Sequence, residues 1–187
     1  IHMSDIYKRE ENIEKAIEYL YLGREMFEED QSIINTEINL YIELGRTDEL
    51  VTKLGEAINL DPENSLLYFN RGTIYDQQGQ VENAESDYLK SIELDPSSFG
   101  SNYNLGALFF NKAVELNNSA NSTSDDKKYK SLKKQADTYF NKGLPYLEEA
   151  HLLDPKDKNT LLSLKQLYYM KGDYQKSDEI KRVISEL

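Results

Sequence analysis

Residues 65–98 read SLLYFNRGTIYDQQGQVENAESDYLKSIELDPSS, and the Asp-Pro pair near the end of this stretch recurs elsewhere in the chain. The segments AINLDPEN, SIELDPSS and AHLLDPKD align on Pro62, Pro96 and Pro155. The first two prolines are 34 residues apart, and the second and third are 59 apart, which is 25 more. A fixed period in this range indicates a repeat architecture, in which each unit packs on its neighbours.

The same stretch carries small and aromatic residues at spacings typical of one repeat family: Tyr68, Gly72, Tyr75, Gly79, Ala84, Tyr88 and Pro96. This pattern resembles the tetratricopeptide repeat (TPR), whose units form two antiparallel helices, A and B. The resemblance implies an all-α fold, a TPR superhelical solenoid of antiparallel helix pairs. On this register one domain, residues 4–187, contains units at 4–30 (partial), 31–64, 65–98, 99–157 and 158–187. Residues 1–3 (Ile-His-Met) are interpreted as a cloning scar.

Local physical chemistry supports this register. The A helices are expected to end at glycines in the left-handed conformation, which are Gly45, Gly79 and Gly172. Each Asp-Pro pair is expected to end a B helix, because the residue before proline avoids the helical region. Small residues are expected where helices approach closely, at Gly23, Ala57 and Ala84. The tyrosines interpreted as inter-helix packing are Tyr41, Tyr75 and Tyr168.

The 25 additional residues fall in the fourth unit, residues 99–157. No glycine ends its A helix, and apolar residues continue at helical spacing to Leu116, where the polar stretch NNSANSTSDDKK (residues 117–128) follows. We therefore expect an elongated helical hairpin with this polar stretch at its tip. Helix A should overshoot by about one turn, and helix B should begin about four turns early. Ser124 is expected to cap helix B, and Pro145 is expected to kink or break it.

Five lysines follow the polar stretch closely in an otherwise acidic chain: Lys127, Lys128, Lys130, Lys133 and Lys134. They can be a solvated face of the projecting hairpin. They can also form an electrostatic docking patch for an acidic partner. The sequence leaves both interpretations open.

In the family that the chain resembles, the A helices line a concave groove. The resemblance places the following side chains on that face: Asn35, Asn39, Phe69, Asn70, Thr73, Gln77, Tyr103, Asn104, Phe110, Asn111, Gln166 and Tyr169. Amides can donate to and accept from a peptide backbone, and aromatic rings offer apolar contact. The positions that hold cations in chaperone-binding members are Asn35, Gly100 and Asn104 here. This difference argues against a clamp for a C-terminal carboxylate.

Composition weighs against several function classes. The chain has 22 basic and 34 acidic residues, a net charge of −12, which is a poor match for a phosphate backbone. It has no cysteine, so thiol nucleophiles and cysteine-ligated metal sites are excluded. Of its two histidines, His2 lies in the expected scar and His151 takes the place of Ile58 and Ile92, so it is interpreted as a packing residue. We find no catalytic motif.

The sequence therefore predicts a non-enzymatic scaffold that binds a protein or peptide, with no cofactor, no metal, no nucleic-acid partner and no membrane insertion. The alternative is a structural module that self-associates through its incomplete ends or the hairpin, as a homodimer or as part of a longer protein. The sequence does not fix the compartment.

Overall fold

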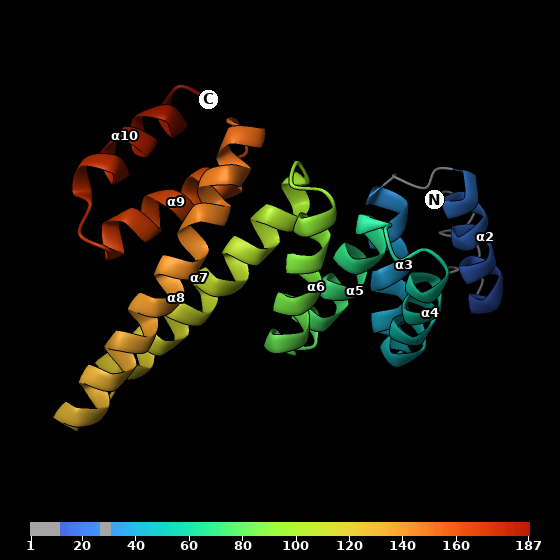
Figure 1. Cartoon of the computed structure of the whole chain (residues 1–187), viewed down its shortest axis with the longest axis horizontal. Coiled ribbons are helices and arrows are strands. Elements are labelled where there is room, and N and C mark those ends of the chain that lie inside the picture. Colours follow the sequence, from blue (N-terminus) through green and yellow to red (C-terminus); the bar gives the residue numbers. More distant parts are fainter. Residues whose placement is uncertain (1–11, 27–30) are drawn as a thin grey trace.

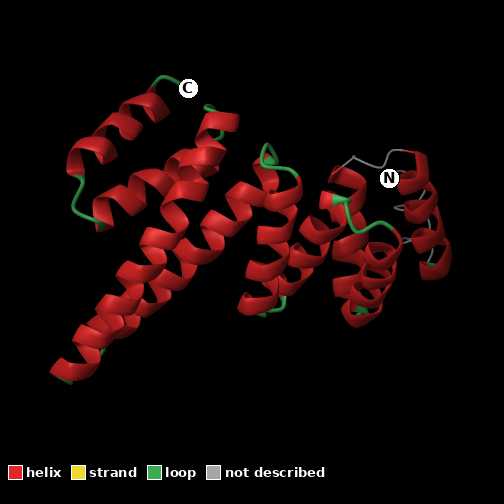
Figure 2. Cartoon of the chain, in the orientation of Figure 1, coloured by secondary structure: helices red, strands yellow, loops and turns green. Residues whose placement is uncertain are grey.

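The computed structural model describes residues 12–26 and 31–187, and every regular element within these ranges is a helix (Figure 2). The expected scar and the expected stub of a first A helix lie outside the described residues. Figure 1 shows the helices following one another along an elongated array. Their bounds are α2 Ile13–Met26, α3 Gln31–Glu43, α4 Thr47–Leu60, α5 Ser65–Gln77, α6 Val81–Leu94, α7 Phe99–Asn121, α8 Asp126–Leu153, α9 Lys158–Met170 and α10 Tyr174–Ser185.

The helices alternate between the two roles of the repeat. Helices α3, α5, α7 and α9 occupy the A positions, and α2, α4, α6, α8 and α10 occupy the B positions. Gly45, Gly79 and Gly172 have φ angles of 65°, 71° and 79°, so the prediction of left-handed residues after three A helices is confirmed. The aspartates of the Asp-Pro pairs are the C-cap residues of three B helices, as expected: Asp61, Asp95 and Asp154.

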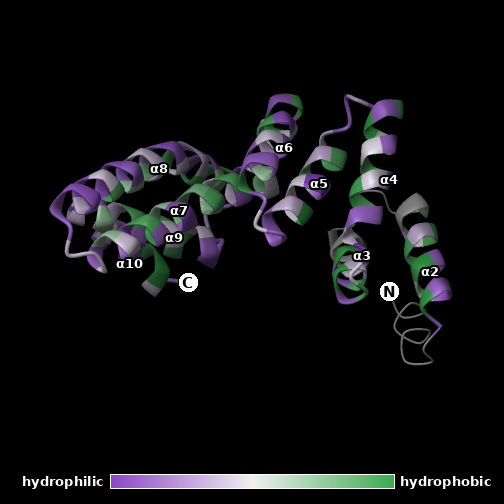
Figure 3. Ribbon diagram, turned by 90° about the horizontal axis from the view of Figure 1, so that it is seen from below, coloured by the Kyte–Doolittle hydropathy of each residue, from purple (hydrophilic) through white to green (hydrophobic). Residues whose placement is uncertain are grey.

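The apolar core runs along the array as a series of clusters between successive helices. Tyr41 and Tyr88 are fully buried in it, and Tyr168 is buried as well. A Cβ atom on Gly72 would lie 3.0 Å from the Tyr88 ring, so a residue without a side chain is needed where α5 meets α6. Figure 3 shows apolar and polar segments alternating around the helices, with polar ribbon prevailing along α8.

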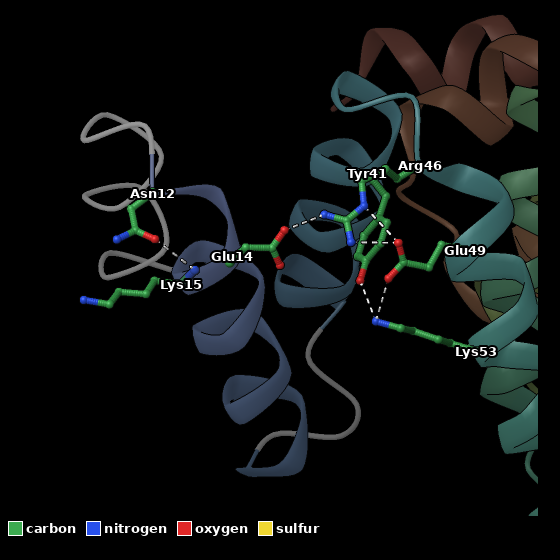
Figure 4. Close-up of polar contacts among 7 residues, drawn as sticks. All are labelled: Asn12, Glu14, Lys15, Tyr41, Arg46, Glu49 and Lys53. Atoms are coloured by element: carbon green, nitrogen blue, oxygen red, sulfur yellow. Dashed lines mark hydrogen bonds and ion pairs between the residues drawn. The ribbon is translucent and has the colours of Figure 1, made fainter.

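A polar network joins α2 to the turn between α3 and α4 (Figure 4). The guanidinium of Arg46 contacts Glu14 of α2 at 3.0 Å and Glu49 of α4 at 2.7 Å. Lys53 binds Glu49 at 3.1 Å and donates a hydrogen bond to the Tyr41 hydroxyl at 2.9 Å. Hydrogen bonding from Arg46 lowers the pKa of Glu49. The network ties the first described B helix to the second repeat through side chains that reach across the helices.

The fourth repeat forms a hairpin that projects from the array (Figure 1). Helix α7 has 23 residues against 13 in α5, so it overshoots by nearly three turns, and the prediction of one turn was wrong. Helix α8 has 28 residues against 14 in α6, which confirms the early start by about four turns. Only residues 122–125 lie between the two helices. The cap of α8 is Asp125 and not Ser124, because the Asp125 carboxylate accepts from the backbone N–H groups of Lys127 and Lys128.

Helix α8 is continuous across Pro145, so the expected break does not occur. Two glycines, Gly106 and Gly143, let α7 and α8 pack closely around the proline, and this packing supports the continuous helix. A Cβ atom on Gly106 would lie 2.7 Å from Leu147 Cγ, and one on Gly143 would lie 3.0 Å from the Gly106 carbonyl oxygen. The backbones of α7 and α8 are thus in close contact on both sides of the proline. Pro145 itself is exposed, so its ring does not disturb this contact.

Candidate functional site

The centre of the expected groove is a polar cluster on α5, α6 and α7, formed by Thr73, Tyr88 and Asn104, with Asn70 one helical turn before Thr73 on α5. The Tyr88 hydroxyl donates to Thr73 Oγ1 at 3.4 Å, and Asn104 Nδ2 donates to the Tyr88 oxygen at 3.3 Å. Thr73 Oγ1 in turn donates to the Phe69 carbonyl at 2.9 Å. Asn70 is only 2% exposed, and its Oδ1 has no hydrogen-bond partner among the described residues. The cluster therefore holds one buried acceptor whose hydrogen-bonding capacity is unused.

Burial raises the pKa of two side chains at this cluster, Tyr88 and Asp76. It raises the pKa of the Tyr88 hydroxyl, so the group stays protonated and able to donate. Asp76, one helical turn after Thr73 on α5, also has its pKa raised by burial, although a hydrogen bond from Tyr88 opposes the shift. The centre of the groove is thus a place where negative charge is disfavoured and neutral hydrogen-bonding groups predominate.

Aromatic side chains flank the cluster. Phe69 lies against the backbone of α7, because a Cβ atom on Gly100 would come within 3.1 Å of its ring. Tyr103 stacks on Phe99 with ring centroids 5.9 Å apart and an interplanar angle of 6°. Both Phe69 and Tyr103 are half-buried, so each keeps part of its surface available for apolar contact.

The structure does not bring all of the expected groove residues to one accessible surface. The members that are exposed are Asn39, Gln77, Asn111, Gln166 and Tyr169. Phe110 is buried against Phe140 of α8, with ring centroids 5.9 Å apart. Tyr169 packs edge-on against Tyr174 at 5.4 Å. The side chain of Asn35 lies outside the described residues. That these residues bind a ligand stays a prediction.

Sequence reasoning missed a buried ion pair beside the cluster. Arg71 of α5 donates two hydrogen bonds of 2.7 Å to the two carboxylate oxygens of Asp87 on α6. Asp87 is buried, and the guanidinium also lies 5.9 Å from the Tyr68 ring and 6.0 Å from the Tyr75 ring. The two residues are 16 apart, on different helices, so no local spacing could have revealed the pair. It fixes α5 against α6 and thereby positions Asn70.

The lysines of the hairpin do not all face solvent equally. Lys127, Lys128, Lys130 and Lys134 are exposed. Lys133 is partly buried, donates a hydrogen bond to Asn117 Oδ1 of α7, and lies 5.8 Å from the Tyr129 ring. Lys133 therefore helps to hold the two helices of the hairpin together, which the sequence did not indicate.

The described residues offer neither a metal site nor a membrane-spanning helix. Within residues 12–26 and 31–187, no three His, Asp or Glu side chains group in a way that could hold a metal ion. In the same ranges, no helix is long and apolar enough to cross a membrane. His151 is half-buried with its Nδ1 unpartnered among the described groups, and no second titratable side chain bonds to it.

Comparison with known proteins fits the helix pairs. A family profile described as "Tetratricopeptide repeat" matches residues 65–98, and a second profile described as "TPR repeat" matches residues 39–79. These two matches identify tetratricopeptide repeats within residues 39–98 of this chain. A curated relative, "Tetratricopeptide repeat protein 16" of Macaca fascicularis, is 28% identical over 115 residues. This alignment covers 55% of the TPR chain described here and 13% of that much longer relative.

Solved structures with the same fold come from several TPR proteins. A crystal structure of MamA has a TM-score of 0.64 at 13% identity and covers 99% of this chain and 87% of its own. Human IFIT1, solved as a dimer with m7Gppp-AAAA, has a TM-score of 0.66 at 14% identity, covering 92% of this chain and 36% of its own. The first TPR domain of Spaghetti (RPAP3), solved with the HSP90 peptide SRMEEVD, has a TM-score of 0.55 at 18% identity, with coverages of 75% and 91%. These likenesses confirm the all-α TPR solenoid.

Proposed function

We propose that this TPR protein is a non-enzymatic scaffold that binds an extended peptide or protein segment along α5 and α7. The observation that carries the proposal is the unused Oδ1 acceptor of Asn70, which is 2% exposed and lies one helical turn before Thr73 on α5. The Asn70 oxygen is covered by protein in this structure, so a peptide N–H group reaches it after local side-chain movement, and the new hydrogen bond then relieves the cost of a buried, unpaired acceptor.

The polarity of the polar cluster indicates which groups of a peptide it binds. The Spaghetti (RPAP3) domain was solved with a peptide, which supports peptide binding by this fold in general. The cationic positions of chaperone-binding members are occupied here by Asn35, Gly100 and Asn104. Burial also raises the pKa of Asp76 at the same face, so an added carboxylate would meet an unfavourable environment. We therefore expect recognition of the main chain and of apolar side chains, with little contribution from a terminal carboxylate.

Phe69 and Tyr103 supply the apolar part of this recognition. Each ring is held by a neighbour in α7, Gly100 for Phe69 and Phe99 for Tyr103, so little side-chain entropy is lost when a ligand contacts them. Rigid aromatic side chains of this kind commonly carry much of the energy of a protein interface.

A displayed library of random peptides, followed by calorimetric titration of a selected peptide, tests the proposal. Asn70→Ala and Asn104→Ala should each weaken binding by about 3- to 10-fold, the equivalent of one hydrogen bond. Asn59→Ala is the matched control, because Asn59 is exposed on α4, a B helix, and should leave the affinity unchanged. Circular dichroism of each variant checks that the fold is intact. Selected peptides that bind both groove variants as well as the wild type would contradict the proposed site.

A further inference from the structure

The tip of the α7–α8 hairpin differs in charge from the rest of the protein. Residues 112–134 carry six lysines against three acidic residues, an excess of three positive charges in a chain of net charge −12. Lys127, Lys130 and Lys134 follow one another at spacings of three and four residues and are all exposed, so they line one face of α8. We call these three residues the basic tip.

The basic tip is not explained by the packing of the hairpin. Ala136 and Phe140, on the opposite face of α8, are the residues buried in the cluster shared with α7 and α9. Positive charge in the first turns of a helix also opposes the helix dipole, at a cost of a few tenths of a kcal/mol for each residue. Asp125 offsets part of this cost as the helix cap. Lysines that neither pack nor stabilise their helix are suited to contact with an acidic surface.

The chain itself carries such a surface. Residues 47–95 contain eleven acidic and three basic residues. All three cations are already paired, in the contacts Lys53–Glu49, Arg71–Asp87 and Lys90–Glu93. Asp48, Glu56 and Glu82 are exposed on α4 and α6, and none of them has an ion-pair partner among the described residues. We call these three residues the acidic face.

The repeat register makes the acidic face continuous from one unit to the next. Asp48 and Glu82 are 34 residues apart, so they occupy the same position at the start of two successive B helices. The corresponding positions in the fourth and fifth units hold Asn141 and Gln175, which are uncharged. The corresponding position of the first unit holds Glu14, which is paired with Arg46, so the acidic residues at this position without an ion-pair partner among the described residues are those of the second and third units.

We propose that the basic tip of one copy of this chain docks on the acidic face of a second copy. Helices α7 and α8 extend beyond a regular unit by roughly 15–20 Å at 1.5 Å per residue, which lets the tip reach out from its own array. The tip lies far from α4 in both Figure 1 and Figure 3, so the contact joins two molecules. Because the two surfaces differ, the contact is head-to-tail and can continue from copy to copy.

Sedimentation velocity at low ionic strength tests this association. The wild type should gain mass with concentration and return to the monomer in about 0.5 M salt, where the Debye length is only a few ångströms. The tip variant Lys127→Glu/Lys130→Glu/Lys134→Glu and the face variant Asp48→Lys/Glu56→Lys/Glu82→Lys should each be monomeric. An equimolar mixture of the two should associate again, because each variant keeps the native surface that the other has lost and the two charge-reversed surfaces are also complementary. The control Lys156→Glu/Lys158→Glu/Lys181→Glu changes net charge as much as the tip variant but should still associate.

A second measurement does not depend on the charge variants. The chain has no cysteine, so Ser124→Cys at the hairpin loop and Ser86→Cys on α6 each introduce one thiol at an exposed position. Mild oxidation of a mixture of the Ser124→Cys and Ser86→Cys variants at low salt should give a disulfide between the two. A mixture of Ser124→Cys with the control Asn159→Cys, whose thiol lies on α9, should not. A wild type that stays monomeric at every concentration and ionic strength, or a charge-reversed mixture that stays monomeric, would overturn the proposal. Asn70→Ala should leave self-association intact, which separates this contact from peptide binding in the groove.

Discussion

Replacing Gly106 by alanine would test whether the crossing of α7 and α8 depends on direct backbone contact. The new Cβ atom would lie 2.7 Å from Leu147 Cγ and 3.0 Å from the Leu147 backbone nitrogen. Leu147 is fully buried, so its side chain has no free space to enter. Overpacking of this kind costs about 1–3 kcal/mol. The contact with a backbone atom, which cannot move aside easily, favours the upper half of that range of costs. The better helix propensity of alanine stabilises the variant by about 1 kcal/mol and so offsets part of the cost. We expect Gly106→Ala to be less stable by a net of about 1–2 kcal/mol.

Gly55→Ala is the matched control, since it makes the same substitution inside α4. Its nearest neighbour is the Arg71 Nη1 atom at 3.8 Å, an ordinary van der Waals distance. Only the gain in helix propensity remains there, so this variant should be more stable than wild type by about 0.5–1 kcal/mol. Urea unfolding followed by far-ultraviolet circular dichroism gives both midpoints. A midpoint for Gly106→Ala at or above that of the wild type would refute the close-contact explanation.

Four further variants probe other parts of the array. Asp87→Ala leaves the partly buried Arg71 without its partner and should cost about 2–4 kcal/mol in urea unfolding, whereas Lys90→Ala, which breaks an exposed pair, should cost at most about 0.5 kcal/mol. Burial raises the pKa of Asp76, so the folded state loses stability as the pH rises through that pKa. Asp76→Asn should therefore raise the melting temperature at neutral pH, and the gain should shrink in acid; an equal gain at both pH values would contradict this. Phe140→Ala should cost about 3–5 kcal/mol, as Phe140 is 3% exposed; a cost below 1 kcal/mol would show that the base of the hairpin is loosely packed.

The repeat register could be predicted because it depends on the backbone requirements of a few residue types. Gly79 was expected in the left-handed conformation, and Asp95 was expected at the end of a B helix; both occur. The length of α7 could not be predicted in the same way. Residues 117–121 have low helix propensity, yet they are helical because Ala120 is fully buried in the hairpin and Asn117 accepts a hydrogen bond from Lys133. Contacts between the two helices outweigh local preference there.

In the candidate site, too, the repeat register predicts which residues lie on the A helices, but not which side chains of different helices contact each other. The register placed Thr73 and Asn104 on A helices, and the structure joins them through the Tyr88 hydroxyl. Phe110 belongs to the same register but is buried, because the ring of Phe140 on α8 packs against it. The contact between Arg71 and Asp87 depends on how two helices face each other, so only the three-dimensional arrangement reveals it.

The lengths added to the fourth repeat also bear on how this hairpin can vary among related proteins. Helix α8 begins 14 residues earlier, relative to its Asp-Pro end, than α6, and helix α7 continues for ten residues more than α5. Both additions lie at the far end of the hairpin, beyond Gly106 and Gly143. Residues can therefore be gained or lost at that end while Gly106 and Gly143 keep their partners. The reach of the arm and the stacking of the array can change independently of each other.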